Sequence, residues 1–287
     1  MQKTKPAKKQ RPAQTIKSRQ GKEEKMSPEP VYFKEKQGKK LIGKVVLITG
    51  GDSGIGRAVA VACAQEGADV AIVYKEDDRD AKVTKSEVEL QNRACLIVRA
   101  NITSFANCKK LVDKVITHFD KLDVLINNAA VQFPQKELSA ITEKQLLTTF
   151  QTNIFSQFYM CQAAEPYLKK GSAIINTTSV TAYRGSNHLL DYSATKGAIV
   201  AFTRSLSAYF VDKGVRVNGV APGPIWTPLI PTTFDAKHVA NFGSEVPMAR
   251  AGQPVEVAGC YVFLASDDSS YMTGQVLHPN GGEIING

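Results

Sequence analysis

Short runs of consecutive apolar residues alternate with longer stretches of helical periodicity from residue 41 onward. A continuous apolar run predicts a strand buried on both faces, and apolar positions three and four residues apart predict a helix that packs on it. The expected strands are residues 45–48, 69–74, 94–98, 122–126, 173–176, 215–220 and 275–277. The expected helices are residues 55–66, 78–91, 107–119, 142–168, 192–210 and 254–265.

This alternation predicts an α/β fold, because right-handed crossovers between parallel strands place helices on both faces of one sheet. We expect a single doubly wound parallel sheet of about seven strands over residues 41–287. Ligands of such sheets bind beyond the carboxyl ends of the strands, where the strand order reverses. Distinctive motifs follow four expected strands, at residues 49–56, residues 127–130, Ser179 and residues 221–223. The pattern therefore predicts one ligand site that these four segments share.

The charge of the chain is concentrated at its start. The 287 residues carry a formal net charge of +9, and residues 1–40 alone hold 13 Lys and Arg against 4 Asp and Glu. This segment is also poor in apolar residues, so we expect a basic and largely disordered extension. Residues 41–287 are balanced in charge, which argues against a nucleic-acid partner.

Cysteine usage and hydropathy exclude some further classes. The five cysteines are scattered without CxxC spacing, which predicts reduced thiols, a cytoplasmic location and no metal site. No run approaches the roughly 18 apolar residues of a membrane span, so we expect no membrane partner. The four histidines (His118, His188, His238 and His278) lack metal-ligand spacing, and we expect surface or structural roles for them. His188 is the exception, because it lies between Ser179 and Tyr192.

The first motif is a glycine-rich loop between an expected strand and an expected helix. Gly50 allows a tight turn there, and Gly54 and Gly56 let the backbone approach a pyrophosphate group and let the helix pack closely on the sheet. The start of a helix favours negative charge. This loop therefore predicts nucleotide binding, although an ordinary strand–turn–helix junction has the same outline.

The second motif pairs Tyr192 with Lys196. Residues four apart share one face of a helix, and a nearby ammonium group lowers the pKa of a tyrosine toward values useful for acid–base catalysis. Tyr32 and Lys36 show the same spacing in the basic extension, so the spacing alone is weak evidence. Ser179, thirteen residues upstream of Tyr192, adds a hydroxyl that could hydrogen-bond a substrate oxygen.

These motifs together resemble the short-chain dehydrogenase/reductase family, in its single-domain branch with a Rossmann-like sheet. The basic extension and the stretch at residues 221–231 are similar to a bacterial subgroup of oxidoreductases, some described as stress proteins. The matching positions are residues 49–56, residues 127–130 (ending in Ala130 where the family usually has Gly), Asn153, Ser179, Tyr192, Lys196, Pro222, Gly223 and Thr227.

The resemblance implies a role for each catalytic residue. Tyr192 would exchange a proton with the substrate oxygen, and Lys196 would lower the pKa of Tyr192 and hold the nicotinamide ribose. Ser179 would orient and polarise the substrate oxygen. Asn153 would hold a water molecule that links Lys196 to solvent.

The resemblance also implies a cofactor site and leaves the cofactor itself open. An Asp usually follows the third strand and bonds the adenine, whereas this chain has Asn101 there, whose amide both donates and accepts. At the end of the second strand Lys75 favours NADP, and Glu76 and Asp77 favour NAD, so we expect NAD or NADP with a slight preference for NAD. The expected cofactor contacts are Gly50, Asp52, Ser53, Gly54, Ile55, Gly56, Tyr74, Lys75, Glu76, Asn101, Ile102, Asn128, Ala129, Tyr192, Lys196, Pro222, Gly223, Ile225 and Thr227.

Residues 223–247 form a long proline-containing segment, which predicts a lid over the substrate. We expect Ile225, Trp226 and Leu229 to line an apolar pocket beneath it, although ordinary packing of these residues is the alternative. Such a pocket favours a neutral or modestly apolar substrate over a phosphorylated sugar.

The sequence thus predicts an NAD(P)-dependent oxidoreductase that interconverts a small alcohol and a ketone or aldehyde, with Tyr192 as the general acid/base. Two alternatives remain: a non-catalytic nucleotide-binding sensor or scaffold that uses the basic arm, and an epimerase or dehydratase on the same fold. The family resemblance further implies a homotetramer assembled through residues 142–168 and 192–210.

Overall fold

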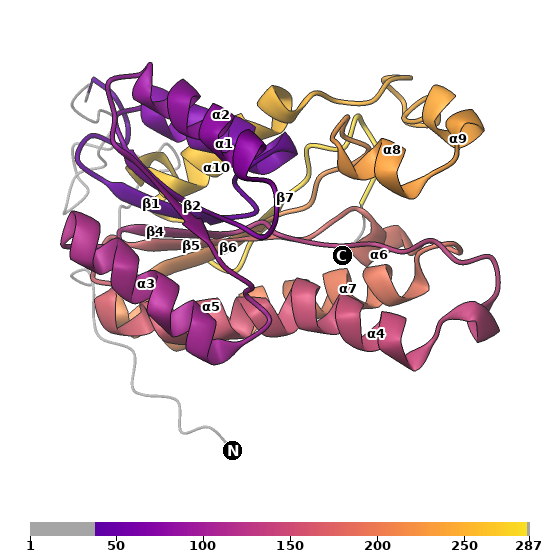
Figure 1. Ribbon diagram of the computed structural model, residues 1–287, viewed down its shortest axis with the longest axis horizontal. Helices are drawn as coiled ribbons and strands as arrows, with labels where there is room; N and C mark the ends of the chain where they lie inside the picture. The colour runs from indigo at the N-terminus through magenta and orange to yellow at the C-terminus, as the bar shows by residue number, and fades with distance from the viewer. Residues whose placement is uncertain (1–37, 286–287) are drawn as a thin grey trace, which may run out of the picture. The chain divides into compact units, whose positions relative to one another are not determined.

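The computed structural model describes residues 38–285, which form one seven-stranded sheet in the order β3-β2-β1-β4-β5-β6-β7 (Figure 1). All six strand pairs are parallel, so the predicted doubly wound sheet is confirmed. The strands are β1 (Val45–Thr49), β2 (Asp69–Tyr74), β3 (Cys95–Arg99), β4 (Val124–Asn127), β5 (Ala173–Thr177), β6 (Arg216–Val220) and β7 (Val276–Leu277). The predicted basic extension lies outside the described residues, apart from its last three positions.

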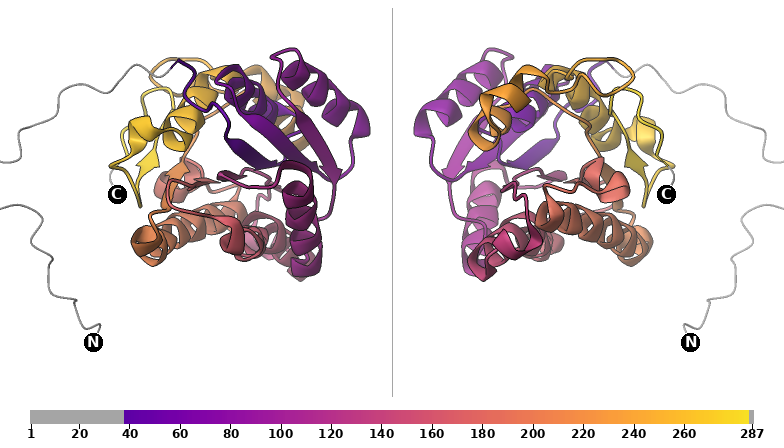
Figure 2. Two further views of the ribbon diagram at one scale, coloured as in Figure 1. Left: turned by 90° about the vertical axis from the view of Figure 1, so that its left-hand side faces the viewer. Right: turned by 90° about the vertical axis from the view of Figure 1, so that its right-hand side faces the viewer.

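Helices cover both faces of the sheet, as the two views of Figure 2 show. One layer contains α1, α2 and α10, and the other contains α3, α4, α5 and α7 (Figure 1). Their bounds are α1 (Gly54–Gln65), α2 (Asp78–Glu89), α3 (Phe105–Phe119), α4 (Glu143–Phe150), α5 (Ser156–Ala164), α7 (Leu190–Phe210) and α10 (Pro254–Ala265). Within residues 38–285 there are also three short helices: α6 (Thr181–Arg184), α8 (Leu229–Thr233) and α9 (Ala236–Ala240).

The alternation of side chains along a strand divides the core between the two layers. All five residues of β1 are buried. Val46 and Ile48 belong to the apolar cluster under α1 and α10, whereas Val45 and Leu47 belong to the cluster under α3, α5 and α7. Successive side chains of a strand point to opposite faces, which explains why both faces require apolar residues and why the run is continuous.

The strand order reverses next to β1. Its parallel partners are β2 on one side, where Val45 pairs with Asp69, and β4 on the other, where Val46 pairs with Val124. The chain builds β1, β2 and β3 outward in one direction and then returns to place β4 on the other side of β1. The carboxyl ends of β1 and β4 therefore flank the crevice in which ligands of such sheets bind.

The expected helix at residues 142–168 is not one regular helix. A π-helical segment, η3 (Gln151–Phe155), separates α4 from α5, and a 3₁₀ turn, η4 (Glu165–Tyr167), follows α5. π-helical turns inside α-helices are frequent at functional sites. A π-helical turn holds about one residue more than an α-helical turn. This change extends over too few residues to alter the hydrophobic periodicity, so the sequence predicted a regular helix.

The expected irregular segment at residues 223–247 contains α8 and α9, which lie on the right of Figure 1. Pro228 occupies the N-cap of α8 and Pro231 lies in its first turn. Proline is tolerated in a first turn because the amide groups there have no partner within the helix. The sequence predicted an irregular segment because of these prolines, but Pro228 and Pro231 lie at the start of α8.

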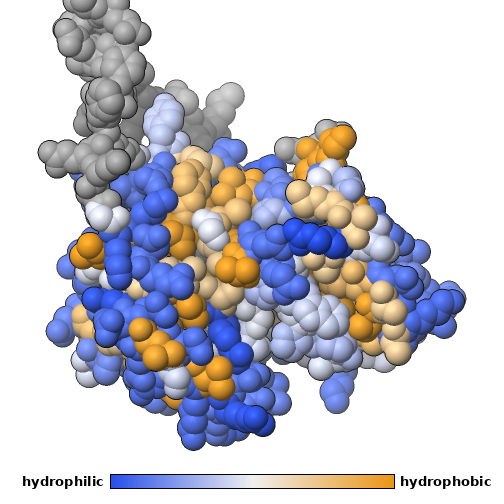
Figure 3. Space-filling model, turned by 90° about the horizontal axis from the view of Figure 1, so that it is seen from above, coloured by the Kyte–Doolittle hydropathy of each residue, from blue (hydrophilic) through white to orange (hydrophobic). Residues whose placement is uncertain are grey.

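Hydrophilic side chains cover much of the face seen in Figure 3, and apolar side chains lie among them in separate clusters. Within residues 38–285 no helix combines the length and the apolar character needed to cross a membrane.

Candidate active site

The glycine loop joins β1 to α1 with almost no free space around it. Gly50 and Gly54 have φ angles of +62° and +52°, which favour glycine. A Cβ atom on Gly56 would lie 1.9 Å from the carbonyl oxygen of Gly50. The N-cap residue of α1, Ser53, makes no side-chain capping hydrogen bond, so the first amide groups of this helix stay available to an anion. This cradle fits a diphosphate group.

Thr49 and Asn128 fasten the loop after β4 to the glycine loop. The Thr49 hydroxyl accepts hydrogen bonds from the backbone amides of Asn128 (3.0 Å) and Ala129 (3.2 Å). The Asn128 side chain donates to the carbonyl oxygens of Thr49 (3.2 Å) and Gly50 (2.9 Å). The two loops therefore form one rigid wall, in which Asn128 also has a structural role that its motif did not reveal.

One cleft of about 1560 Å³ runs along the carboxyl ends of the strands. Its volume exceeds that of a typical drug-sized site, so it has room for a dinucleotide and a substrate together. The cleft is lined by the predicted residues Gly50, Asp52, Ser53, Gly54, Ile55, Tyr74, Lys75, Glu76, Asn101, Ile102, Asn128, Ala129, Ser179, Tyr192, Lys196, Pro222, Gly223, Ile225 and Thr227. Gly56 and Asn153 are not among its lining residues, because both lie behind it.

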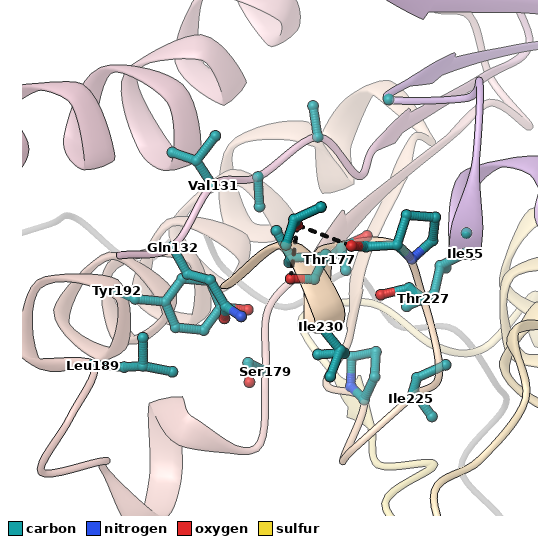
Figure 4. A pocket seen from close by; sticks show the side chains of 18 of the residues that line it. Ile55, Val131, Gln132, Thr177, Ser179, Leu189, Tyr192, Ile225, Thr227 and Ile230 are labelled. Carbon is teal, nitrogen blue, oxygen red and sulfur yellow. Dashed lines mark hydrogen bonds between the residues drawn. The ribbon is translucent and has the colours of Figure 1, made fainter. Parts of the chain in front are cut away.

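Ser179, from the loop after β5, meets Tyr192 and Lys196 of α7 in this cleft. Lys196 is 1 % exposed, and its ammonium group donates to the carbonyl oxygen of Thr177 at 3.0 Å. The same ammonium nitrogen lies 5.2 Å from the centroid of the Tyr192 ring. Figure 4 shows Tyr192 and Ser179 facing one cavity.

The sequence predicted that Lys196 would lower the pKa of Tyr192, and this prediction is wrong. Burial raises the pKa of Tyr192 to about 12, and a hydrogen bond with Ser179 only partly opposes this rise. Burial also lowers the pKa of Lys196 to about 7. Desolvation penalises the charged form of both groups. Spacing along a helix indicated that the two side chains would be close, but it could not indicate how completely water is excluded.

Asn153 clamps the loop after β4 instead of lining the cleft. It lies in the π-helical segment, its side-chain oxygen accepts from the Val131 amide (2.8 Å), and its nitrogen donates to the Val131 carbonyl (2.9 Å) and to Thr195 (3.1 Å). The wider turn of the π segment places this side chain between the loop and α7. Its predicted water-holding role stays a prediction.

The end of β2 presents one basic and one acidic side chain. Lys75 and Glu76 form an ion pair at 2.9 Å, with side chains 70 % and 73 % exposed, and Lys75 holds the pKa of Glu76 below its usual value. Asp77, the other acidic candidate, caps α2 by accepting from the amides of Arg79 (3.0 Å) and Asp80 (2.9 Å). Lys75 and Glu76 are therefore the main residues at this position that could discriminate between NAD and NADP.

At the end of β3, Asn101 uses part of its hydrogen-bonding capacity within the protein. Its side-chain oxygen accepts from the amide of Thr103 (3.0 Å) and from its hydroxyl (2.9 Å). The side-chain NH₂ group stays available as a donor. An adenine base would therefore meet a donor here, where the family's usual Asp offers an acceptor.

The substrate end of the cleft differs in part from the prediction. Ile225 and Leu229 line it as expected, but Trp226 does not, and its side chain is 43 % exposed. His188 lines the cleft, whereas His118 and His278 do not. Sequence reasoning missed several lining residues that carry no motif: Val131, Gln132, Thr181, Leu189 and Ile230. In the described part of the chain, no group of three His, Cys, Asp or Glu side chains could hold a metal ion.

A family model described as enoyl-(acyl carrier protein) reductase matches residues 50–283. General stress protein 39 of Bacillus subtilis is 55 % identical over 96 % of this chain and 98 % of its own length. A glucose and ribitol dehydrogenase of Daucus carota is 53 % identical, over 96 % of this chain and 98 % of its own. The chloroplastic NADPH-dependent aldehyde reductase 1 of Arabidopsis thaliana is 52 % identical, over 93 % of this chain and 96 % of its own.

Solved structures share the fold. A short chain dehydrogenase from Burkholderia cenocepacia J2315, in complex with NADP, superposes with a TM-score of 0.80. It is 30 % identical in sequence, and the match covers 85 % of this chain and 98 % of that one. The similarity therefore extends over nearly the whole of the neighbour.

Proposed function

The chain belongs to the short-chain dehydrogenase/reductase family and is an oxidoreductase that acts on alcohol and carbonyl groups, and we propose that Tyr192 exchanges the proton in this reaction. The observation that carries the proposal is the meeting of Ser179, Tyr192 and Lys196 in the cleft that begins at the glycine loop. Relatives named as dehydrogenases and reductases favour this function over a non-catalytic sensor and over epimerisation or dehydration.

Each residue would contribute a separate part of the reaction. A nicotinamide cofactor, when bound, supplies or accepts the hydride. The N-terminus of α1 would hold its diphosphate, and Lys196 its ribose hydroxyls. Ser179 and Tyr192 would both hydrogen-bond the carbonyl oxygen and stabilise the negative charge that develops there. Because burial raises the pKa of Tyr192 to about 12, its hydroxyl carries a proton at neutral pH and can donate it during carbonyl reduction.

We propose NADP as the cofactor, in place of the slight preference for NAD that the sequence indicated. One homologous structure contains NADP and one relative is named for NADPH. In this chain Lys75 is the exposed base at the end of β2, and a 2′-phosphate would replace Glu76 as its partner. The capping role of Asp77 removes one of the two acidic residues that had favoured NAD.

Fluorescence titration of the protein with NADPH and NADH tests both proposals. We expect the protein to bind NADPH more tightly than NADH. Lys75→Ala should weaken the affinity for NADPH by about tenfold or more and change the affinity for NADH by less than about twofold. Lys85→Ala is the matched control, because Lys85 also pairs with a glutamate, at 3.6 Å, but on α2 away from the cleft. Tighter binding of NADH would contradict the cofactor proposal alone, whereas binding of neither would contradict the hydride-transfer function.

The names of the relatives and the cleft suggest the substrate. A polyol or sugar and an aldehyde appear in the names of two relatives, and we propose a small uncharged carbonyl compound with hydroxyl groups. Arg184, which lines the same cleft, pairs with Glu283 at 3.0 Å, so its charge is already compensated. The lid function of residues 223–247 stays a prediction, supported by the position of α8 along the cleft.

The predicted homotetramer and the predicted cytoplasmic location remain proposals. Large apolar side chains on the surface of α4, α5, α7 and the segments that adjoin them support an interface there. These side chains are Leu146 (42 % exposed), Leu147 (48 %), Phe155 (40 %), Phe158 (43 %), Tyr209 (56 %) and Val211 (55 %).

A further inference from the structure

Gln132 is a buried polar residue at the substrate end of the cleft, two positions beyond the motif that follows β4. Its side chain is 8 % exposed and lines the cleft. Among residues 38–285 its carboxamide makes no hydrogen bond, and it is not one of the polar groups that are sealed from solvent without a partner, so it faces the open cleft. A few polar groups with this kind of access fix the orientation of a ligand in a cleft, and the Gln132 carboxamide is free to bond one because it has no partner in the described residues.

The backbone on both sides of Gln132 is fixed. Asn153 holds the amide of Val131 at 2.8 Å and its carbonyl at 2.9 Å. On the other side, Gln145 donates to the carbonyl oxygen of Phe133 at 3.1 Å and to the buried carboxylate of Asp191 at 3.0 Å. The backbone that carries Gln132 is therefore held in position before a ligand binds, which lowers the entropy lost on binding.

The surroundings of this carboxamide combine the reacting groups with apolar walls. Figure 4 shows Gln132 beside the ring of Tyr192, in the cavity that Ser179 also faces. Leu189 and Ile230 line the same region and offer no side-chain hydrogen bond. Ligand sites of this kind use a few polar groups to fix orientation. A substrate whose reacting oxygen lies at Ser179 and Tyr192 would bring its adjoining atoms to Gln132.

We propose that Gln132 binds a hydroxyl group next to the reacting carbonyl, so that the site selects α-hydroxy carbonyl compounds and the corresponding vicinal diols. A carboxamide both donates and accepts hydrogen bonds, as a hydroxyl group does. A substrate that lacks this hydroxyl group shields the Gln132 carboxamide from water without forming a hydrogen bond to it. The unmade hydrogen bond lowers the binding energy in the transition state. This inference rests on the proposed oxidoreductase function and adds the feature of the substrate that the enzyme recognises.

Two ketones that differ only in this group provide the test. We expect the wild-type enzyme, with NADPH, to reduce 3-hydroxybutan-2-one with a kcat/KM about tenfold or more above that for butan-2-one. Gln132→Leu keeps the approximate volume and removes the hydrogen bond, so it should lower this ratio by about tenfold. Gln132→Met, which keeps an unbranched side chain, should show the same loss and protects the test against misfolding of the leucine variant.

Gln65→Leu is the matched control, because Gln65 is an exposed glutamine at the end of α1 and does not line the cleft. It should leave the ratio within about twofold of wild type, and every variant should bind NADPH as the wild type does. An unchanged ratio in both Gln132 variants would overturn the inference, as would a wild-type preference for butan-2-one. Reduction of other carbonyl compounds but of neither ketone would also overturn it, whereas bound NADPH without reduction of any carbonyl would refute the proposed function itself.

Discussion

Replacing Gly56 with alanine adds one methyl group where α1 meets the glycine loop. Its Cβ atom would lie 1.9 Å from the Gly50 oxygen and 2.9 Å from the Asn128 side-chain nitrogen, which itself bonds that oxygen. The obstacle is thus backbone that the Asn128 side chain holds in place. Helix propensity alone would stabilise the variant by up to about 1 kcal/mol, but overpacking of this kind costs about 1–3 kcal/mol. We expect Gly56→Ala to be the less stable protein.

Gly259→Ala is the control, because Gly259 also lies inside a helix, α10, and a Cβ there meets no atom within 4 Å. This variant should gain up to about 1 kcal/mol, so the two unfolding free energies should differ by about 1–3 kcal/mol. Urea denaturation measures this difference, and NADPH titration should show at least about tenfold weaker binding to Gly56→Ala alone. Equal stability of the two variants would refute the packing argument, and normal NADPH binding by Gly56→Ala would refute the diphosphate cradle.

Three further outcomes can be measured. Tyr192→Phe should lower kcat by about 10²–10⁴ with NADPH binding unchanged, and wild-type turnover would exclude Tyr192 as the proton donor. Because burial lowers the pKa of Lys196 to about 7 from 10.5, the unfolded chain binds more protons between these values. The unfolding free energy should therefore rise with pH in this window by up to about 1.4 kcal/mol per unit relative to Lys196→Met, and parallel pH profiles would contradict this. Leu147→Lys should reduce the mass measured by light scattering below that of a tetramer, and a wild-type mass of one protomer would disprove the predicted assembly.

The sequence was most informative where one physical cause controls the pattern. Continuous apolar runs such as those of β1 and β2 are typical of strands that are covered on both faces, and all seven expected strands are present. The glycine loop was equally readable, because positive φ angles at Gly50 and Gly54 exclude most other residues. These constraints are local, and they restrict which residue types can occupy each position, so they can be recognised in the sequence.

Features that depend on the three-dimensional surroundings of a residue could not be recognised in the sequence. The π segment around Asn153 differs from an α-helix by one residue in a turn, and hydrophobic periodicity averages over such a change. Trp226 was expected in the pocket because its neighbours are apolar, but the bend of the chain exposes it. The pKa of Tyr192 depends on how completely its surroundings exclude water. Gln132 lies in a loop without periodicity, and only the structure reveals that it lines the cleft without a hydrogen-bond partner among residues 38–285.

The order of the strands has a consequence for synthesis on the ribosome. β1 emerges early, yet its second partner, β4, begins at Val124, and the cleft also needs Gly223 from beyond β6. Gly223 in turn donates to the carbonyl oxygen of Pro279, next to the last strand. A nascent chain therefore exposes one edge of β1, with its unpaired backbone N–H and C=O groups, until β4 has been translated, and non-local pairing of this kind forms slowly. The complete cofactor site can form only after β7 and Pro279 have been translated, so shorter nascent chains should depend on chaperones and gain no stability from the cofactor.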